Sequence, residues 1–253
     1  MFPEVIFIIP YRNREQHKEF FLYYIQKILK DVKYHYEIYF CHQCDNREFN
    51  RGATKNIGFT FIKNKYPDNY KNITLVFHDI DTMPYKENII NYPTGKNNVK
   101  HFYGFNYALG GIVSINAEDF EKINGFPNFF GWGMEDNVLQ NRCTKNELHI
   151  DRSNFFKIGN HNILHIFDSY IKKYDPVAVT RTLKEDNDGI STLYNVNYNC
   201  EKKDNHFMLN ILTFEGLYKE NINSLKEHDL RKGNQLHARI SHNRKRFNKM
   251  FLM

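Results

Sequence analysis

Apolar, strand-like runs alternate with amphipathic helical segments over the first eighty residues of this chain. Val5-Ile6-Phe7-Ile8-Ile9 is a continuous apolar run ended by Pro10, the pattern of a parallel strand buried on both faces. We expect a helix over residues 15–30, a strand over 36–41, a helix over 51–65 and a strand over 73–77. This order predicts a doubly wound α/β sheet, in which ligands bind beyond the carboxyl ends of the strands.

The alternation loosens after residue 84. We expect a short strand over residues 112–115, a helix over 117–123, a turn over 124–127 and a helix from about Glu135. Residues 192–198 and 206–213 are possible strands in an Asn- and Lys-rich last third. Because no repeat or long linker is visible, we predict one α/β domain over residues 1–200. A C-terminal extension over 201–253 is expected to pack on it and to end in a basic tail.

The composition is that of a soluble globular protein, with 41% hydrophobic and 25% charged residues. The formal charge of +6 suits an anionic partner such as a nucleotide diphosphate, although a Lys-rich surface explains it better when taken alone. Basic residues form no stripe interleaved with aromatics. Arg244-Lys245-Arg246 reads as a solvated tail, so nucleic-acid binding is disfavoured.

The sequence shows neither a signal peptide nor an apolar run long enough to span a bilayer. If the chain begins at its natural start, a cytoplasmic protein is expected. Of the four cysteines, Cys41 and Cys44 have C-x-x-C spacing, but Cys143 and Cys200 are isolated. A zinc site needs a second pair, so free thiols are predicted.

Asp79-Ile80-Asp81 follows the third apolar strand. Two carboxylates at positions i and i+2 of a turn can converge on one hard divalent cation, which can neutralise a diphosphate leaving group. The same pattern occurs by chance in many loops. The apolar strand before it makes a cation site about as plausible as a chance occurrence.

Gly131-Trp132-Gly133-Met134-Glu135-Asp136 combines a possible hinge, a large ring and an acidic pair. Trp132 could cover a ligand, and the dipole of the following helix would keep the carboxylates ionised, as a base requires. The alternative is a helix cap with a Trp in the core. The presence of Asp79 and Asp81 on the same chain favours a functional interpretation.

Two further clusters and a histidine pair carry weaker signals. Tyr11-Arg12-Asn13-Arg14 and Phe49-Asn50-Arg51 offer rings and guanidinium groups that can hold a base and a phosphate, or can form surface salt bridges. His161 and His165 are four residues apart. Imidazole completes mixed carboxylate and nitrogen sites for Mn²⁺, although a lone histidine is more often structural.

Taken in order, these motifs resemble the β-1,4-galactosyltransferase family, from about residue 5 to about residue 200. The matching segments are Ile9-Pro10-Tyr11-Arg12-Asn13-Arg14, Phe49-Asn50-Arg51, Asn56-Ile57-Gly58-Phe59, His78-Asp79-Ile80-Asp81, Gly110-Gly111, Asn124-Gly125-Phe126-Pro127, Gly131-Trp132-Gly133-Met134-Glu135-Asp136 and Asp188-Gly189-Ile190-Ser191-Thr192-Leu193. The start at His78 and the region of His165 resemble most the branch that galactosylates xylose on proteoglycan linkers.

The resemblance implies a GT-A fold, which is a Rossmann-like, mostly parallel sheet flanked by helices. It also implies a UDP-sugar donor, Mn²⁺ and inversion at the anomeric carbon. Asp136 would be the catalytic base and Glu135 a sugar-binding carboxylate. Asp81 and His165 would ligate the metal. The residues expected to bind the substrates are Pro10, Tyr11, Arg12, Arg14, Phe49, Arg51, Asp79, Ile80, Gly110, Gly111, Trp132, Gly133 and Asn137.

Three departures from the family pattern bear on specificity. Asn137 replaces a third acidic residue that touches the acceptor in relatives, so the acceptor identity stays open. Ala108 stands where relatives often have an aromatic residue that walls the donor sugar, so N-acetylgalactosamine is as admissible as galactose. His161 is our candidate for a third metal ligand, and Asn162 or Ile163 could hold that place instead.

We therefore predict an inverting, metal-dependent transferase that moves a hexose from a UDP-sugar to a hydroxyl of a glycan or glycoconjugate acceptor. The alternative is a catalytically silent module that binds a nucleotide sugar. The resemblance adds a second possibility for the location, in which the chain is the trimmed catalytic part of a Golgi-type enzyme.

Overall fold

The computed structural model describes residues 2–167, 169–184 and 187–232, and the expected basic tail lies outside this part of the chain. The helices are α1 (Glu15–Ile28), α2 (Arg51–Lys65), α3 (Ala117–Lys122), α4 (Glu135–Lys145) and α5 (Pro176–Lys184). The strands of the central sheet are β1 (Val5–Tyr11), β2 (Tyr36–Gln43), β3 (Thr74–His78), β5 (Asn98–Gly104), β6 (Ile112–Asn116), β7 (His149–Asp151), β8 (Phe156–Lys157), β11 (Tyr194–Lys202) and β12 (Phe207–Glu215).

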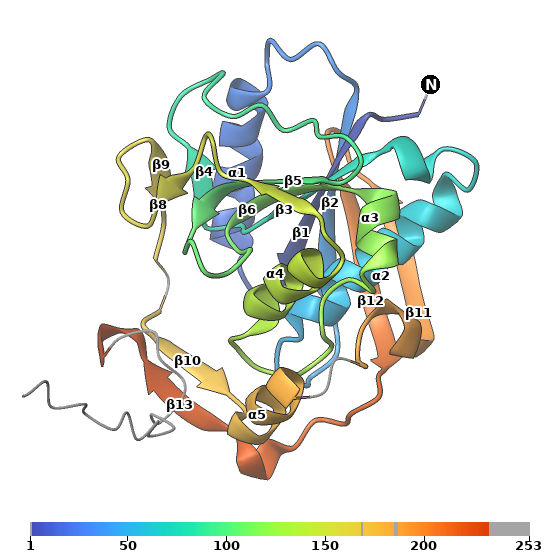
Figure 1. Ribbon diagram of the computed structural model, residues 1–253, viewed down its shortest axis with the longest axis vertical. Coiled ribbons are helices and arrows are strands. Elements are labelled where there is room, and N and C mark those ends of the chain that lie inside the picture. Colours follow the sequence, from blue (N-terminus) through green and yellow to red (C-terminus); the bar gives the residue numbers. More distant parts are fainter. Residues whose placement is uncertain (1, 168, 185–186, 233–253) are drawn as a thin grey trace, which may run out of the picture.

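The central sheet has the order β11-β12-β2-β1-β3-β6-β5-β7, with β8 paired to β5. β1 lies between β2 and β3 and is parallel to both, and β12 is parallel to β2 (Figure 1). Only β3–β6, β5–β6 and β11–β12 are antiparallel within the described sheet. The mostly parallel α/β architecture predicted from the sequence is therefore confirmed.

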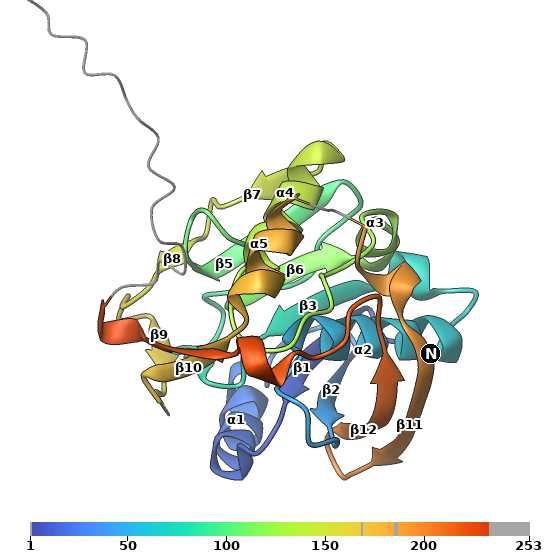
Figure 2. The ribbon, with the colours of Figure 1, turned by 90° about the horizontal axis from the view of Figure 1, so that it is seen from below.

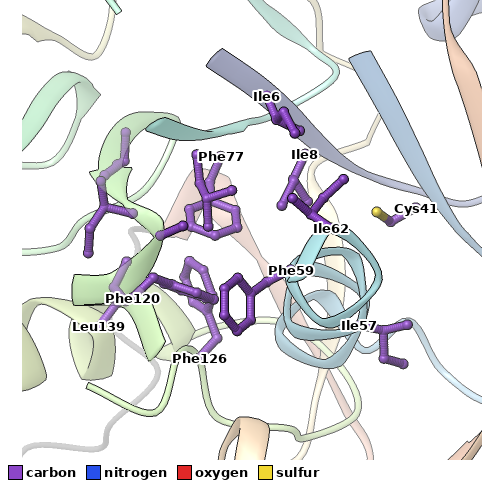
Figure 3. Close-up of a cluster of buried hydrophobic side chains, with 14 of the residues drawn as sticks. Ile6, Ile8, Cys41, Ile57, Phe59, Ile62, Phe77, Phe120, Phe126 and Leu139 are labelled. Atoms are coloured by element: carbon purple, nitrogen blue, oxygen red, sulfur yellow. The ribbon is translucent and has the colours of Figure 1, made fainter. Parts of the chain in front are cut away.

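The alternation of side chains along β1 builds one apolar layer on each face of the sheet. Ile6 and Ile8 pack with α2 and α3, whereas Phe7 and Ile9 pack with α1. On the α2 side, Phe59 points from α2 toward the rings of Phe120 and Phe126, which follow β6 in the chain (Figure 3). Its ring centroid is 5.3 Å from that of Phe120 in an edge arrangement. These two layers fix α1 and α2 against β1.

A buried polar network holds the turn over residues 124–128 between α2 and α4. The side-chain amide of Asn56 donates to the carbonyl of Phe126 (2.7 Å) and to Oδ1 of Asn128 (2.8 Å). Asp188 accepts from the backbone N–H of Asn128 (2.6 Å) and from its amide (3.0 Å). Arg142 of α4 donates to the carbonyl of Gly125 (2.6 Å) and also to that of Asp188. The turn that leads to Trp132 is therefore fixed from both sides.

Four short strands lie outside the central sheet. β4 (Thr82–Pro84) pairs with β9 (Ile163–His165), and β10 (Ile171–Tyr174) pairs with β13 (Lys226–Asp229). The second pair, here called the outer sheet, lies near α5 at the lower end of the molecule in Figure 1, which is the end nearest the viewer in Figure 2. The sequence predicts an α/β domain over residues 1–200 and an extension from residue 201. β11 runs across residue 200 and β12 pairs with β2, and the boundary between these two parts stays a prediction.

Two further sequence expectations concern cysteines and membrane helices. Cys41, Cys44, Cys143 and Cys200 are free thiols, as expected. Within the described ranges, no helix combines the length and the apolar character needed to cross a bilayer.

Gly52 of α2 packs against the turn over residues 124–128. A substitution at Gly52 therefore tests how closely the helix must approach that turn. A Cβ atom on Gly52 would lie less than 3.0 Å from the carbonyl oxygen of Pro127, whereas one on Gly95 would meet nothing within 4 Å. Helix propensity alone would make Gly52→Ala stabilising by about 1 kcal/mol. We expect the opposite sign, with a loss of about 1–3 kcal/mol in the free energy of unfolding, because the helix must move away. Urea denaturation followed by circular dichroism measures this, with Gly95→Ala as the control. Equal midpoints for the two variants would contradict the packing argument.

Candidate functional site

A cavity of about 470 Å³ opens beyond the carboxyl ends of β1 and β3. Its volume is within the range of small-molecule sites, about 300–1,000 Å³. Most of the residues singled out in the sequence line it: Pro10, Arg14, Phe49, Arg51, Asp79, Ile80, Asp81, Gly110, Gly111, Trp132, Gly133, Glu135, Asp136, Asn137 and His165. The fold thus brings together motifs that are spread over more than half of the chain.

Three of the singled-out residues do not line this cavity: Tyr11, Arg12 and His161. β1 continues through Tyr11, so this side chain points to the face opposite to that of Pro10. Its hydroxyl donates to Glu15 of α1 (2.7 Å), and burial raises its pKa. Arg12 donates to the carbonyl of Arg47. His161 is exposed in the turn before β9. Their roles in binding stay predictions.

An acidic pair and a histidine meet at the end of β3. Arg14 Nη1 lies 3.0 Å from Asp81 Oδ2, and the backbone N–H of Ile166 donates to the carbonyl of Asp81 (2.8 Å). Burial and then the Asp79 carboxylate raise the pKa of Asp81, while the charges of Arg14 and His165 lower it. Two nearby carboxylates in a partly buried site favour a bound cation.

His165 is fixed by contacts that the sequence analysis did not anticipate. The Tyr103 hydroxyl lies 3.1 Å from His165 Nδ1, a contact of the kind that orients metal-bound imidazoles. Within the described residues, no three His, Cys, Asp or Glu side chains are arranged to hold a metal ion. Asp81 and His165 therefore fit part of the coordination sphere of a metal ion. A ligand such as a diphosphate would have to supply further oxygen donors.

The acidic pair at the start of α4, Glu135 and Asp136, lines the same cavity as Asp79. Gly131 and Gly133 adopt φ angles of 98° and 106°, which favour glycine, and the chain then enters α4 at Glu135. Glu135 is buried, with Oε2 lacking a hydrogen-bond partner among the described residues. Both carboxylates lie in the first turn of α4, where the helix dipole favours negative charge.

Asp136 sits against the loop between β5 and β6. A Cβ atom on Gly110 would lie less than 3.0 Å from the carboxylate of Asp136, so only glycine fits there. The backbone N–H of Leu109 donates to the carbonyl of Asp136 (3.0 Å). Burial raises the pKa of this carboxyl to about 7, Lys55 lowers it, and Glu135 and Asp79 raise it. A carboxyl with this pKa can accept a proton near neutral pH.

Lys55 of α2 is the most informative lining residue that the sequence analysis missed. Its Nζ lies 3.6 Å from Asp136 Oδ1, and its side chain is almost fully buried. The periodicity of α2 was an available signal, because Lys55 follows Arg51 by one turn and both therefore lie on the same face of the helix.

Aromatic side chains form the rim of the cavity. Phe105 and Tyr107 stack with centroids 5.2 Å apart, and His165 and Phe167 stack at 4.1 Å. Tyr107 and Phe167 are more than half exposed. Ala108 lies in the wall beside Tyr107, where the small side chain leaves room.

The outer sheet closes the cavity on the side of Trp132. The backbone N–H of Trp132 donates to the carbonyl of Lys173 in β10 (2.8 Å). The indole stacks on His228 of β13, with centroids 6.0 Å apart and planes 11° apart. Leu230 and Arg231, directly after β13, line the cavity. No sequence pattern indicated that this segment returns to the site, because its short strands lack apolar alternation.

The sequence matches two family models. One describes the N-terminal region of glycosyl transferase group 7 and matches residues 2–92. The other describes the N-terminal domain of galactosyltransferase and matches residues 95–166. The outer sheet lies entirely outside these two segments.

Several curated relatives are β-1,4-galactosyltransferases. β-1,4-Galactosyltransferase 4 of Cricetulus griseus is 33% identical over 162 residues, which cover 59% of this chain and 45% of the relative. β-1,4-Galactosyltransferase 1 of Mus musculus is 33% identical over 160 residues, which cover 60% and 39%. The chain thus spans less than half the length of these relatives.

The fold is also similar to a solved structure, the catalytic domain of Drosophila β-1,4-galactosyltransferase 7 in complex with xylobiose. The TM-score is 0.70 at 22% identity, covering 83% of this chain and 94% of that one. A variant of the same enzyme, in complex with manganese, UDP-Gal and xylobiose, matches with a TM-score of 0.65. At this identity the likeness establishes the GT-A fold.

Trp132 is the single tryptophan of the chain, so its fluorescence reports on this loop alone. We expect His228→Ala to shift the emission to longer wavelength and to increase quenching by acrylamide, because the indole loses its stacked neighbour. Ile222→Ala, in the same segment and 71% exposed, is the control. Spectra and quenching identical to the wild type would show that β13 does not hold Trp132.

Proposed function

Because two models of one family together cover residues 2–92 and 95–166, this chain belongs to the glycosyltransferase group 7 family of β-1,4-galactosyltransferases, and we propose that it is a metal-dependent, inverting hexosyltransferase. The donor is a UDP-sugar, and the acceptor is a hydroxyl of a glycan or glycoconjugate. One observation carries the proposal: Asp136 lines the same cavity as Asp79 and Asp81. A single site can then hold a cation at one end and take up a proton at the other.

Asp136 is the proposed catalytic base. It takes the proton of the acceptor hydroxyl while that oxygen bonds to the anomeric carbon. The bond from this carbon to the diphosphate oxygen breaks, and its electron pair leaves with UDP. Attack from the face opposite UDP inverts the anomeric configuration, as in hydrolases that activate water in the same way. Oδ1 of Asp136 is buried and has no hydrogen-bond partner among the described residues.

A cation and a guanidinium would hold the diphosphate, at what we take as the phosphate end of the cavity. Mn²⁺ held by Asp81 and His165 would neutralise the departing diphosphate. The Arg51 guanidinium lies 4.8 Å from the Phe49 ring centroid, and both side chains line the cavity. A guanidinium over a ring can hold a phosphate while the ring contacts the nucleotide. Pro10, Arg14 and Ile80 complete this end.

The sugar end of the cavity favours galactose or N-acetylgalactosamine as the transferred hexose. Ala108, in place of a larger ring, leaves room for an N-acetyl group. Trp132 and Glu135 are positioned to contact the sugars, and the outer sheet supports Trp132. Closure of the cavity around both sugars would exclude water, which competes with the acceptor for the donor.

A panel of UDP-galactose, UDP-GalNAc, UDP-glucose, UDP-GlcNAc and UDP-xylose tests the donor and the metal together. We expect release of UDP only with Mn²⁺ and fastest with the first two donors. Asp81→Asn should raise the Mn²⁺ concentration needed for half activity, because it removes one charged ligand. Equal turnover in EDTA would end the metal assignment. UDP binding without turnover of any donor, over a set of acceptor sugars, would support the silent module instead.

Asp136→Asn tests the base. We expect kcat to fall by about 10²-fold or more, in line with the usual contribution of a general base. Binding of UDP, followed through Trp132 fluorescence, should stay within about twofold of the wild type, since the diphosphate lies at the other end of the cavity. Asp68→Asn, at an exposed turn, is the control. If Asp136→Asn keeps its turnover, another group takes the proton.

A further inference from the structure

Lys55 occupies an unusual place for a lysine. It lies on α2 between the buried residues Thr54 and Asn56 and is only 4% exposed. Its Nζ is 4.3 Å from the centroid of the Phe126 ring. Lysine is almost never fully buried unless its charge is paired, because removing an ammonium from water is costly. Something in the site must therefore compensate this charge.

The partner of Lys55 is the proposed base. Lys55 Nζ lies 3.6 Å from Asp136 Oδ1, and within the described chain no other recorded ion pair involves this lysine. The distance is too long for a good hydrogen bond, and Oδ1 has no hydrogen-bond partner among the described residues. Lys55 therefore acts on the carboxylate through its charge and not through a hydrogen bond.

We propose that Lys55 is a positioning residue for Asp136, whose ammonium keeps this carboxylate ionised and oriented to accept the proton of the acceptor hydroxyl. The inference rests on the proposed function and deepens it. Neither the family models nor the names of the relatives assign a role to this residue, and the sequence analysis did not single it out.

The charges around Asp136 explain why it needs a cation. Lys55 and Arg51 of α2 favour its ionised form, whereas Glu135 of α4 and Asp79 after β3 oppose it. Burial opposes it most strongly, and the net result is a pKa of about 7. Without Lys55, the pKa of Asp136 would rise further. The base would then be protonated, and inactive, at neutral pH.

Lys55→Met removes the charge and keeps an unbranched apolar stem. We expect the acid limb of the pH profile of kcat/KM to move upward by about one unit, the lower end of the effect of a nearby opposite charge. Activity at pH 6 should then fall about tenfold and approach the wild type near pH 9. Lys55→Arg should restore the wild-type profile. Lys63→Met, on the same helix with an ion pair to Glu121 near the surface, is the control.

Two outcomes would overturn the proposal. An acid limb unchanged in Lys55→Met would mean that the ammonium does not act on the base. A loss of equal size at every pH, not restored by Lys55→Arg, would mean that Lys55 serves packing or substrate binding alone. Lys55→Gln serves the same comparison if the methionine variant does not fold.

A titration without turnover separates this proposal from the proposed function. Carbon-13 NMR of carboxyl-labelled protein, without added metal, gives the midpoint for Asp136, assigned by its absence in Asp136→Asn. We expect a higher midpoint in Lys55→Met than in the wild type, and equal midpoints would overturn the role of Lys55. If the wild type transfers no hexose from any donor, the proposed function fails, and this titration still decides whether Lys55 holds the charge of Asp136.

Discussion

The buried carboxylate of Asp188 is the interaction on which the arrangement of this site depends. It accepts two hydrogen bonds from Asn128 and one from Thr192 (2.8 Å), and Asn128 is in turn bonded to Asn56 of α2. A buried charge is tolerated only where hydrogen bonds replace its hydration, so every member of the network has one permitted place. The turn before Trp132 is thereby fixed relative to α2, and the chain continues from it through Trp132 to the start of α4 at Glu135. The Asp188 segment, which in the sequence is a family signature, thus has a structural role.

The placement of α2 against α4 determines the chemistry of the cavity. Lys55 and Asp136 belong to different helices, and their separation follows from the close contact of Gly52 with Pro127 and of Gly110 with Asp136. A side chain at either glycine would clash with the group that it faces and force that group to shift. Since the interaction of two buried charges depends strongly on distance and local dielectric, the backbone packing sets the proton affinity of the base.

The first eighty residues are readable from sequence because their strands are buried on both faces and their helices carry one apolar stripe. The sequence pattern alone therefore places the carboxyl ends of β1 and β3 at one edge of the sheet. The errors of detail have local causes. The strand expected over residues 5–9 continues through Tyr11, and the period of two then directs this side chain to α1. Lys55 has the sequence context of a solvated residue, and only its position one turn after Arg51 on α2 could have indicated the cavity. The pairing of β10 with β13 joins segments far apart in the chain, and their charged residues give no alternation to detect.

The charged side chains that line the cavity are not equivalent, because some form recorded ion pairs within the described chain and others do not. This difference bears on the orientation of a bound ligand. Arg14 is paired with Asp81 and Lys55 with Asp136, and all four residues line the cavity. Arg51 also lines it, and among the described residues no recorded ion pair involves this guanidinium, whose bond to the Gly131 carbonyl is long at 3.5 Å. A diphosphate would therefore find its cationic partner at Arg51, near Phe49, while the two paired carboxylates remain for a cation and a proton. In the proposed function, a nucleotide sugar would bind with its anomeric carbon toward Asp136, because the opposite orientation would place the phosphates against the carboxylates of Glu135 and Asp136.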